Sequence, residues 1–239
     1  MSESHYKRVL IKLSGDAFSS DGETIGSRAL SHICGEIEKA YFTGTQIGLV
    51  VGGGNILRGG KWSKDSGVDR ATADYMGMLA TVLNALALQS ALEKRGMETR
   101  VLSAIEMRPV AEPYIRRRAL RHLEKGRIVI FAAGTGNPFL TTDTAAALRA
   151  SEIDADILMK ATKVDGVYSA DPEKDPSALR YSELSYQDVL TQNLQVMDAA
   201  AISVCRQKKI PILVFSFLKE NSLIEAVQGK SIGTIIRGD

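Results

Sequence analysis

The stretch Arg127–Asp143, RIVIFAAGTGNPFLTTD, constrains the fold more than any other part of the chain. Ile128–Ala132 is a short apolar run rich in β-branched residues, which predicts a buried strand. The glycines of Gly134–Pro138 end that strand, and the polar Thr141–Asp143 can cap a helix that begins near Thr144–Arg149. A loop of small residues between a strand end and a helix start can hold an anion. A tight turn without a ligand is the alternative.

The same alternation of strand and helix patterns runs through all 239 residues. It predicts an α/β fold, with a mainly parallel central sheet and helices on both faces, in a single domain. Residues 103–113, with two prolines, are expected to be irregular. The predicted strands are 7–13, 47–51, 99–102, 128–132, 157–159, 212–215 and 233–236, and the predicted helices are 27–41, 71–94, 114–125, 144–149 and 222–227. Residues 184–207 are expected to be largely helical, with a helix start at Asp198–Ala201 near a loop.

Composition excludes several classes of function. Thirty Lys and Arg against 28 Asp and Glu leave a formal charge of +2, which gives no argument for nucleic-acid binding. Cys34 and Cys205 lack CxxC spacing, so we expect buried, reduced thiols in a cytoplasmic protein. His5, His32 and His122 show no metal-ligand spacing.

The helix predicted over 71–94 is unusually apolar. Thr81, Asn84 and Gln89 interrupt its apolar run, and the N-terminus has no apolar signal region, so we expect no membrane segment. Met76, Leu79, Leu83 and Leu86 recur at helical spacing, with further apolar residues that widen the stripe beyond what one sheet face needs. This extra apolar surface on the helix predicts a subunit contact, and the alternative is a central helix that is fully buried within one chain.

Three strand ends carry glycine-bearing loops, Lys12–Gly15, Gly52–Asn55 and Gly134–Asn137. Because parallel strands end on one edge of a sheet, these loops can line one crevice. Several amide-rich loops suit a polyphosphate, and Lys12, Arg58 and Lys160 add positive charge at the rim. A GxxxxGK[ST] motif is absent from the sequence. Gly52 and Gly134 each begin a GxG sequence, but Leu57 and Phe139 stand where the GxGxxG dinucleotide motif has its last glycine.

Lys12, Lys160 and Asp143 form a candidate set for phosphoryl transfer. That reaction depends on positioning and on neutralising charge over the transferring oxygens. Two lysines that flank the group, oriented by a carboxylate, meet this need without a covalent intermediate. Taken singly, each lysine can be a strand-end residue that reaches solvent, and Asp143 can be a helix cap.

Eight segments, in order and at near-family spacing from about Tyr6 to the C-terminus, resemble the bacterial uridylate (UMP) kinases of the amino acid kinase superfamily. The KLSG, GGGN and KVDGVY elements are typical of the superfamily, whereas DxMGML and TGNPFxTTD are narrower. The segments are Lys12–Gly15, Val51–Asn55, Arg58–Gly59, Asp74–Leu79, Gly134–Asp143, Lys160–Tyr168, Asp171–Pro172 and Val196–Asp198.

The resemblance implies an enzyme that transfers the γ-phosphoryl group of ATP to UMP with Mg²⁺, giving UDP for pyrimidine nucleotide synthesis. It implies catalytic roles for Lys12, Lys160 and Asp143, a supporting carboxylate at Asp198, and Mg²⁺ held mainly by the ATP phosphates. The expected ATP contacts are Lys12, Leu13, Ser14, Gly15, Gly54, Arg58, Thr162, Tyr168 and Asp171. The expected UMP contacts are Gly53, Asp74, Thr135, Gly136, Asn137, Pro138, Phe139, Leu140, Thr141 and Thr142.

The resemblance also implies a homohexamer built from dimers, commonly activated by GTP and inhibited by UTP. We expect two lobes, an acceptor side over roughly 1–155 and an ATP side over roughly 156–239. The loops 19–26 and 60–68, which includes Trp62, are less like the family. Two alternatives stay open: a related kinase that acts on a carboxylate or carbamate, and a nucleotide-binding regulator or storage protein without turnover.

Overall fold

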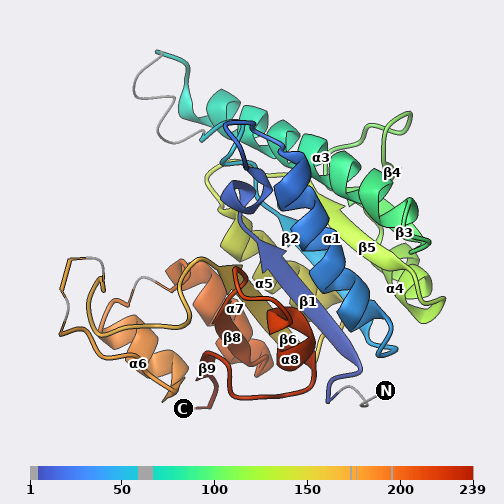
Figure 1. The fold of residues 1–239 in the computed structure, drawn as a ribbon. Helices are drawn as coiled ribbons and strands as arrows, with labels where there is room; N and C mark the ends of the chain where they lie inside the picture. The colour runs from blue at the N-terminus through green and yellow to red at the C-terminus, as the bar shows by residue number, and fades with distance from the viewer. Residues whose placement is uncertain (1–4, 59–66, 173, 176, 195, 239) are drawn as a thin grey trace.

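A computed structural model describes residues 5–58, 67–172, 174–175, 177–194 and 196–238 (Figure 1). Trp62, singled out in the sequence, lies outside the described residues. Within them, one sheet has the strand order β4-β3-β5-β2-β1-β6-β8-β9-β7. The strands are β1 (Arg8–Leu13), β2 (Gln46–Val51), β3 (Thr99–Ser103), β4 (Glu112–Pro113), β5 (Ile128–Ala132), β6 (Ile157–Thr162), β7 (Glu183–Leu184), β8 (Ile212–Ser216) and β9 (Thr234–Ile236).

The sheet is mainly parallel, as predicted. β1 lies at its centre between β2 and β6, and both pairs are parallel. The pair of β8 and β9 is an exception, because β9 runs antiparallel to β8. The carboxyl ends of β1, β2, β5 and β6 therefore share one edge of the sheet.

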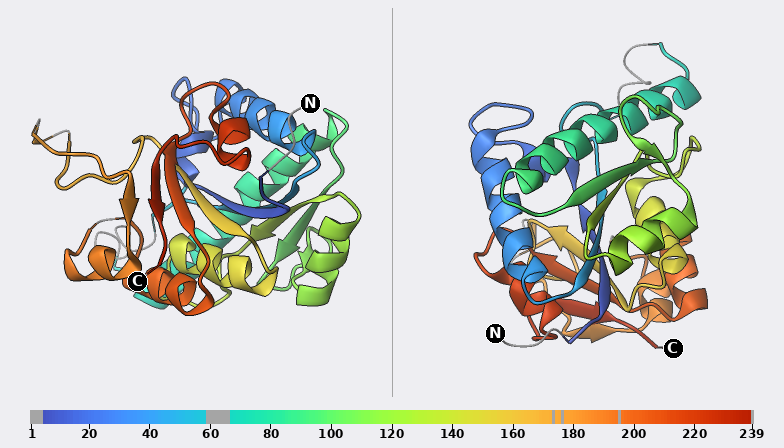
Figure 2. Two further views of the ribbon diagram at one scale, coloured as in Figure 1. Left: turned by 90° about the horizontal axis from the view of Figure 1, so that it is seen from below. Right: turned by 90° about the vertical axis from the view of Figure 1, so that its right-hand side faces the viewer.

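Helices cover both faces of the sheet, and each face has its own apolar core. Figure 2 shows α1 and α8 on one side of the strands and α4, α5 and α7 on the other. α3 packs beside α1 (Figure 1). The bounds are η1 (Gly15–Phe18), α1 (Ser27–Tyr41), α3 (Arg70–Glu93), α4 (Arg116–Glu124), α5 (Thr142–Glu152), α6 (Tyr186–Thr191), α7 (Ala199–Lys208) and α8 (Ser222–Val227).

The structure confirms one expected helix start and corrects two other expectations about elements. The largely helical stretch 184–207 divides into α6 and α7, and the side chain of Asp198, where a helix start was expected, caps α7. The segment 103–113, expected to be irregular, ends in the short strand β4, which pairs with β3. The helix expected from Tyr114 begins at Arg116. Cys34 and Cys205 are buried free thiols, as predicted, and burial raises their pKa values to about 11 and about 12.

Helix α3 is only partly covered. Its inner residues, such as Leu88 and Leu92, are fully buried, whereas Leu79 and Leu83 are 49% and 52% exposed. The alternative of a fully buried helix is therefore wrong. By length and composition α3 could cross a membrane, and 44% of its apolar window is buried. The core helix of a globular protein passes the same test, so this is weak evidence for a membrane span.

Candidate active site

Two lysines lie side by side at the centre of the sheet. β1 and β6 are adjacent and parallel, and their register pairs Lys12 with Lys160. Side chains alternate along a strand, so Lys12 shares a face with Leu10 and Lys160 shares that face with Leu158. Both leucines belong to the core under α4, α5 and α7. The two ammonium groups therefore lie on the face that α5 covers.

Asp143 lies between these lysines. Its Oδ1 is 3.1 Å from Lys12 Nζ and its Oδ2 is 3.0 Å from Lys160 Nζ. The second contact is a hydrogen bond, whereas Oδ1 has no hydrogen bond of acceptable geometry among the described residues. All three side chains are at most 16% exposed, so neither lysine is a strand-end residue that reaches freely into solvent.

Electrostatics in this cluster favour a charged carboxylate. Burial raises the pKa of Asp143, but the neighbouring Lys12 and Lys160 outweigh it and hold the pKa below its usual value. Burial lowers the pKa of Lys160, and Asp143 opposes that shift only in part. Lys160 also donates a hydrogen bond to the carbonyl of Val196. The site thus presents two lysine side chains around one buried anion.

Thr141, not Asp143, caps helix α5. The Thr141 hydroxyl accepts hydrogen bonds from the amides of Asp143 (3.0 Å) and Thr144 (3.3 Å). The alternative of Asp143 as a helix cap is therefore wrong, and its carboxylate is left for the lysines. Asp198 accepts hydrogen bonds from the hydroxyls of Thr141 and Thr144 and from the amide of Ala201. It joins the start of α5 to the start of α7.

The glycine loops after β1 and β2 touch each other. A Cβ atom on Gly15 would lie 2.4 Å from the Gly54 nitrogen, so only glycine allows this approach. The buried side chain of Asn84 from α3 donates to the carbonyl of Gly52 (2.7 Å) and exchanges hydrogen bonds with the side chain of Asn55. Two of the three predicted loops therefore form one surface beside Lys12.

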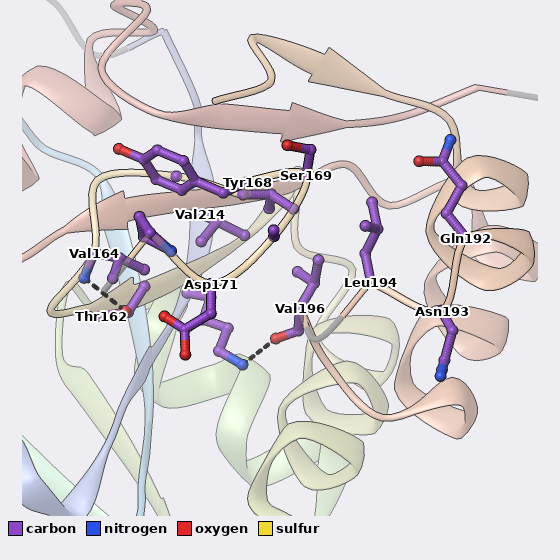
Figure 3. Close-up of a pocket in the computed structure, with 15 residues that line it drawn as sticks. Thr162, Val164, Tyr168, Ser169, Asp171, Gln192, Asn193, Leu194, Val196 and Val214 are labelled. Carbon is purple, nitrogen blue, oxygen red and sulfur yellow. Dashed lines mark hydrogen bonds between the residues drawn. The ribbon is translucent and has the colours of Figure 1, made fainter. Parts of the chain in front are cut away.

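A cavity of about 430 Å³ opens beside Lys160 (Figure 3). Three predicted ATP contacts line it, Thr162, Tyr168 and Asp171. The Tyr168 hydroxyl donates to Asp165 (2.7 Å), which holds the KVDGVY turn in place. The residues of the 192–194 turn after α6 also line the cavity, and the sequence pattern gave no signal for them. Figure 3 shows the Asp171 carboxylate directed into this space.

Residues 133–141, called the acceptor loop below, connect β5 to α5 and contain all but the last of the UMP contacts expected at Thr135–Thr142. Within it the Thr135 hydroxyl accepts from the amide of Asn137 (3.1 Å). The Phe139 amide donates to Asp74 of α3 (2.9 Å), and the Phe139 side chain is 65% exposed. Asp74 of α3 and the loop after β5, both expected among the UMP contacts, therefore lie together in the structure.

Some predicted residues lie apart from the lysine cluster. Arg58 does not line the cavity: it is exposed and forms an ion pair with Asp16 (2.6 Å). Asp171, which lines the cavity, forms an ion pair with Lys174 (3.1 Å) and not with Lys12 or Lys160 among the contacts of the described residues. Among the described residues, no group of three or more His, Cys, Asp or Glu side chains is placed to hold a metal ion.

Comparisons with known proteins agree with this architecture. A family model described as "Amino acid kinase family" matches residues 7–216. A UMP kinase from Bacillus anthracis is 43% identical, with a TM-score of 0.95, over 98% of this chain and 97% of that one. A UMP kinase from Ureaplasma parvum is 37% identical, with a TM-score of 0.92, over the full length of both chains. A uridylate kinase from Archaeoglobus fulgidus is 32% identical, with a TM-score of 0.74, over 95% of this chain and 99% of that one.

Proposed function

Because this chain belongs to the amino acid kinase family, we propose that it phosphorylates UMP to UDP with Mg-ATP. The observation that carries the proposal is the cluster of Lys12, Asp143 and Lys160 at the junction of the acceptor loop and the cavity. Similarity to UMP kinases over nearly the whole chain supports UMP as the acceptor. Pyrimidine nucleotide synthesis is the expected place of this reaction.

The two lysines would stabilise the transferring phosphoryl group. They lie on adjacent strands, 3.1 and 3.0 Å from one carboxylate, so the two cations are held close together before any nucleotide binds. These preorganised cations would stabilise the negative charge on the equatorial oxygens of the transferring phosphoryl group. Such electrostatic stabilisation is the main source of catalysis in phosphoryl transfer. Asp143 would orient both lysines during direct in-line transfer, without a covalent intermediate.

ATP would occupy the cavity beside Lys160, with Thr162, Tyr168 and Asp171 in its wall. The contacting loops at Lys12–Gly15 and Gly54 offer amides toward the phosphates. Mg²⁺ would be held mainly by the ATP phosphates, as the family resemblance implies, and would neutralise their charge. We assign the ATP side to roughly 156–239 and the acceptor side to roughly 1–155, with Arg58 as an outer contact.

UMP would bind along the loop from Thr135 to Thr142, next to Gly53. The exposed ring of Phe139 offers an apolar surface, and the amides and hydroxyls of the loop suit a phosphate or base. Asp74 Oδ2 contacts the loop through the Phe139 amide, and the carboxylate can accept further hydrogen bonds from sugar hydroxyls. Asp198 would support this side through its hydrogen bond from Thr141.

We also propose that the exposed apolar face of α3 forms a subunit contact. Leu79, Leu83 and Val110 are each about half exposed and line an apolar hollow of about 410 Å³ with Met76 and Leu86. Burial of such a patch is typical of oligomers. A hexamer built from dimers, activation by GTP and inhibition by UTP stay predictions from the family resemblance, and a cytoplasmic location stays a prediction from the sequence.

One assay tests the proposal against its alternatives. ADP release is measured with Mg-ATP and UMP, CMP, dTMP, aspartate, N-acetylglutamate or carbamate, each with and without GTP, and again after chelation of Mg²⁺. Turnover with UMP alone, lost on chelation, is the expected result. Turnover with a carboxylate or carbamate would overturn the acceptor. A protein that binds ATP but turns over none of them would be a regulator or storage protein.

A further inference from the structure

The acceptor loop contains two residues in a backbone conformation that side chains rarely adopt. Ala133 has φ 60° and Phe139 has φ 68°, and neither is glycine. Such conformations persist when the surrounding structure holds them. Ala133 begins the acceptor loop and Phe139 lies near its end. The groups that fix these two residues therefore set the backbone shape of residues 134–138 between them.

Helix α3 holds both residues by their amides. The Ala133 amide donates to the hydroxyl of Thr81 (2.8 Å), and the Phe139 amide donates to the carboxylate of Asp74 (2.9 Å). Thr81 and Asp74 are seven residues apart, about two helical turns, so they lie on the same face of α3. Arg70 Nε contacts both oxygens of Asp74 at 2.9 Å and fixes the carboxylate.

Of these two hydrogen bonds, the one between Thr81 and the Ala133 amide is the harder for water to replace. Ala133 is fully buried and Thr81 is 4% exposed, so water is poorly placed to replace the hydroxyl. That hydroxyl donates its own proton to the carbonyl of Met78 (2.7 Å), which turns its oxygen lone pairs toward the Ala133 amide. Without the hydroxyl a buried amide would lose its partner.

The same helix also sets the position of the second glycine loop. A Cβ atom on Gly53 would lie 2.8 Å from Ala80 Cβ and 3.0 Å from the Thr81 nitrogen. Thr81 therefore lies where α3 passes between the loop after β2 and the loop after β5. We therefore expect a change at Thr81 to shift the loop after β5 relative to the loop after β2.

We propose that Thr81 is a positioning residue for the acceptor substrate, acting with Asp74 to hold both ends of the acceptor loop. This rests on the proposed function, because it assigns the loop to UMP. Thr81 itself touches no substrate: it acts through the Ala133 amide. The inference predicts an effect on UMP rather than on ATP, because α3 holds the acceptor loop and contributes nothing to the wall of the cavity beside Lys160.

The test compares Thr81→Val, which removes the hydroxyl at nearly constant shape, with Thr81→Ser, which keeps it. Thr81→Val should raise the KM for UMP about tenfold and leave the KM for ATP unchanged, and Thr81→Ser should restore the KM for UMP. Thr99→Val is the matched control. It also removes a buried hydroxyl, one that donates to Met97 (2.9 Å) at the start of β3, and should change neither KM.

A second readout needs no substrate. Hydrogen exchange of the Ala133 amide, followed by NMR, should be faster in Thr81→Val than in the wild type and normal in Thr81→Ser. Thr81→Ala, which also lacks the hydroxyl, replaces Thr81→Val if the latter does not fold. A normal KM for UMP in a folded variant, or unchanged Ala133 exchange, would overturn the inference. Wild-type protein without UMP turnover would instead count against the proposed function, and the exchange measurement would still decide the anchoring.

Discussion

Neutralising Asp143 is the sharpest test of the lysine cluster. Asp143→Asn keeps the size of the side chain but leaves Lys12 and Lys160 close together without their shared anion. At 3.0–3.1 Å and an effective dielectric constant of about 20, each carboxylate–ammonium attraction is worth about 5 kcal/mol before desolvation is subtracted. The side chains are 11–16% exposed, so solvent screens these pairs only weakly.

Two effects on activity follow from this loss. Burial already lowers the pKa of Lys160, and the charge of Asp143 opposes the shift, so Asp143→Asn should lower that pKa further. Because a neutral lysine cannot stabilise the phosphoryl group, the alkaline limb of kcat should move to lower pH. Loss of electrostatic preorganisation of this kind costs about 3–4 kcal/mol, so kcat should fall about 10²–10³-fold at pH 7.

The assay is ADP release at saturating ATP and UMP across pH, with circular dichroism to check the fold. Asp154→Asn is a matched control near the other end of α5. Its side chain is 68% exposed, and its φ of 52° suits asparagine equally well. The control should keep the wild-type kcat and pH profile. An Asp143→Asn enzyme with unchanged kcat and an unmoved alkaline limb would refute the orienting role.

Three further predictions concern other parts of the molecule. Asp74→Asn should raise the KM for UMP about tenfold and more than the KM for ATP in initial-rate measurements; equal effects would remove Asp74 from the acceptor side. The double variant Leu79→Glu, Leu83→Glu should lower the assembled mass in sedimentation velocity, and an unchanged mass would contradict a subunit contact on α3. Burial raises the pKa of Glu36, but two backbone amides at the start of α8 and Lys39 outweigh it and lower the pKa. The stabilisation of the folded state by the ionised Glu36 carboxylate is therefore fully present above the unfolded pKa of about 4.3. It is lost as pH falls through the lower pKa of the folded state. Glu36→Gln should reduce the free energy of unfolding by about 2 kcal/mol at pH 7 and by less at pH 3 in urea denaturation. An equal loss at both pH values would show that the charge is not responsible.

Most of the fold was predictable because its strands and helices carry clear periodicity. The apolar run at Ile128–Ala132 is strand β5 with the predicted bounds, and helix α1 likewise matches Ser27–Tyr41. β4 and β7 have two residues each, too few for any period, and they exist because neighbouring strands offer free hydrogen-bonding edges. The start of α7 was predictable from Asp198, a residue that favours helix starts, and the structure confirms it as the cap of that helix.

The lysine cluster was predictable for a related reason. Lys12 and Lys160 interrupt apolar strands, and charged residues at such positions need a partner. Alternation along each strand gives the face on which the lysines lie, although the sequence alone does not give the register of β1 with β6. Asp143 was open to interpretation as a helix cap, and only the structure shows that Thr141 has that role.

Thr81 and Asn84 show where sequence reasoning failed and why. In the sequence they are polar interruptions of an apolar helix, and they argued only against a membrane span. In the structure both are buried, and each holds a loop that lies far away in the chain: Thr81 the amide of Ala133, and Asn84 the carbonyl of Gly52. No local pattern encodes such partners. A buried polar side chain must nevertheless be hydrogen-bonded, and the glycine-bearing strand ends are the places in an α/β fold where backbone groups lie outside the ladder. Polar residues on the inner face of a core helix therefore indicate which loops that helix organises.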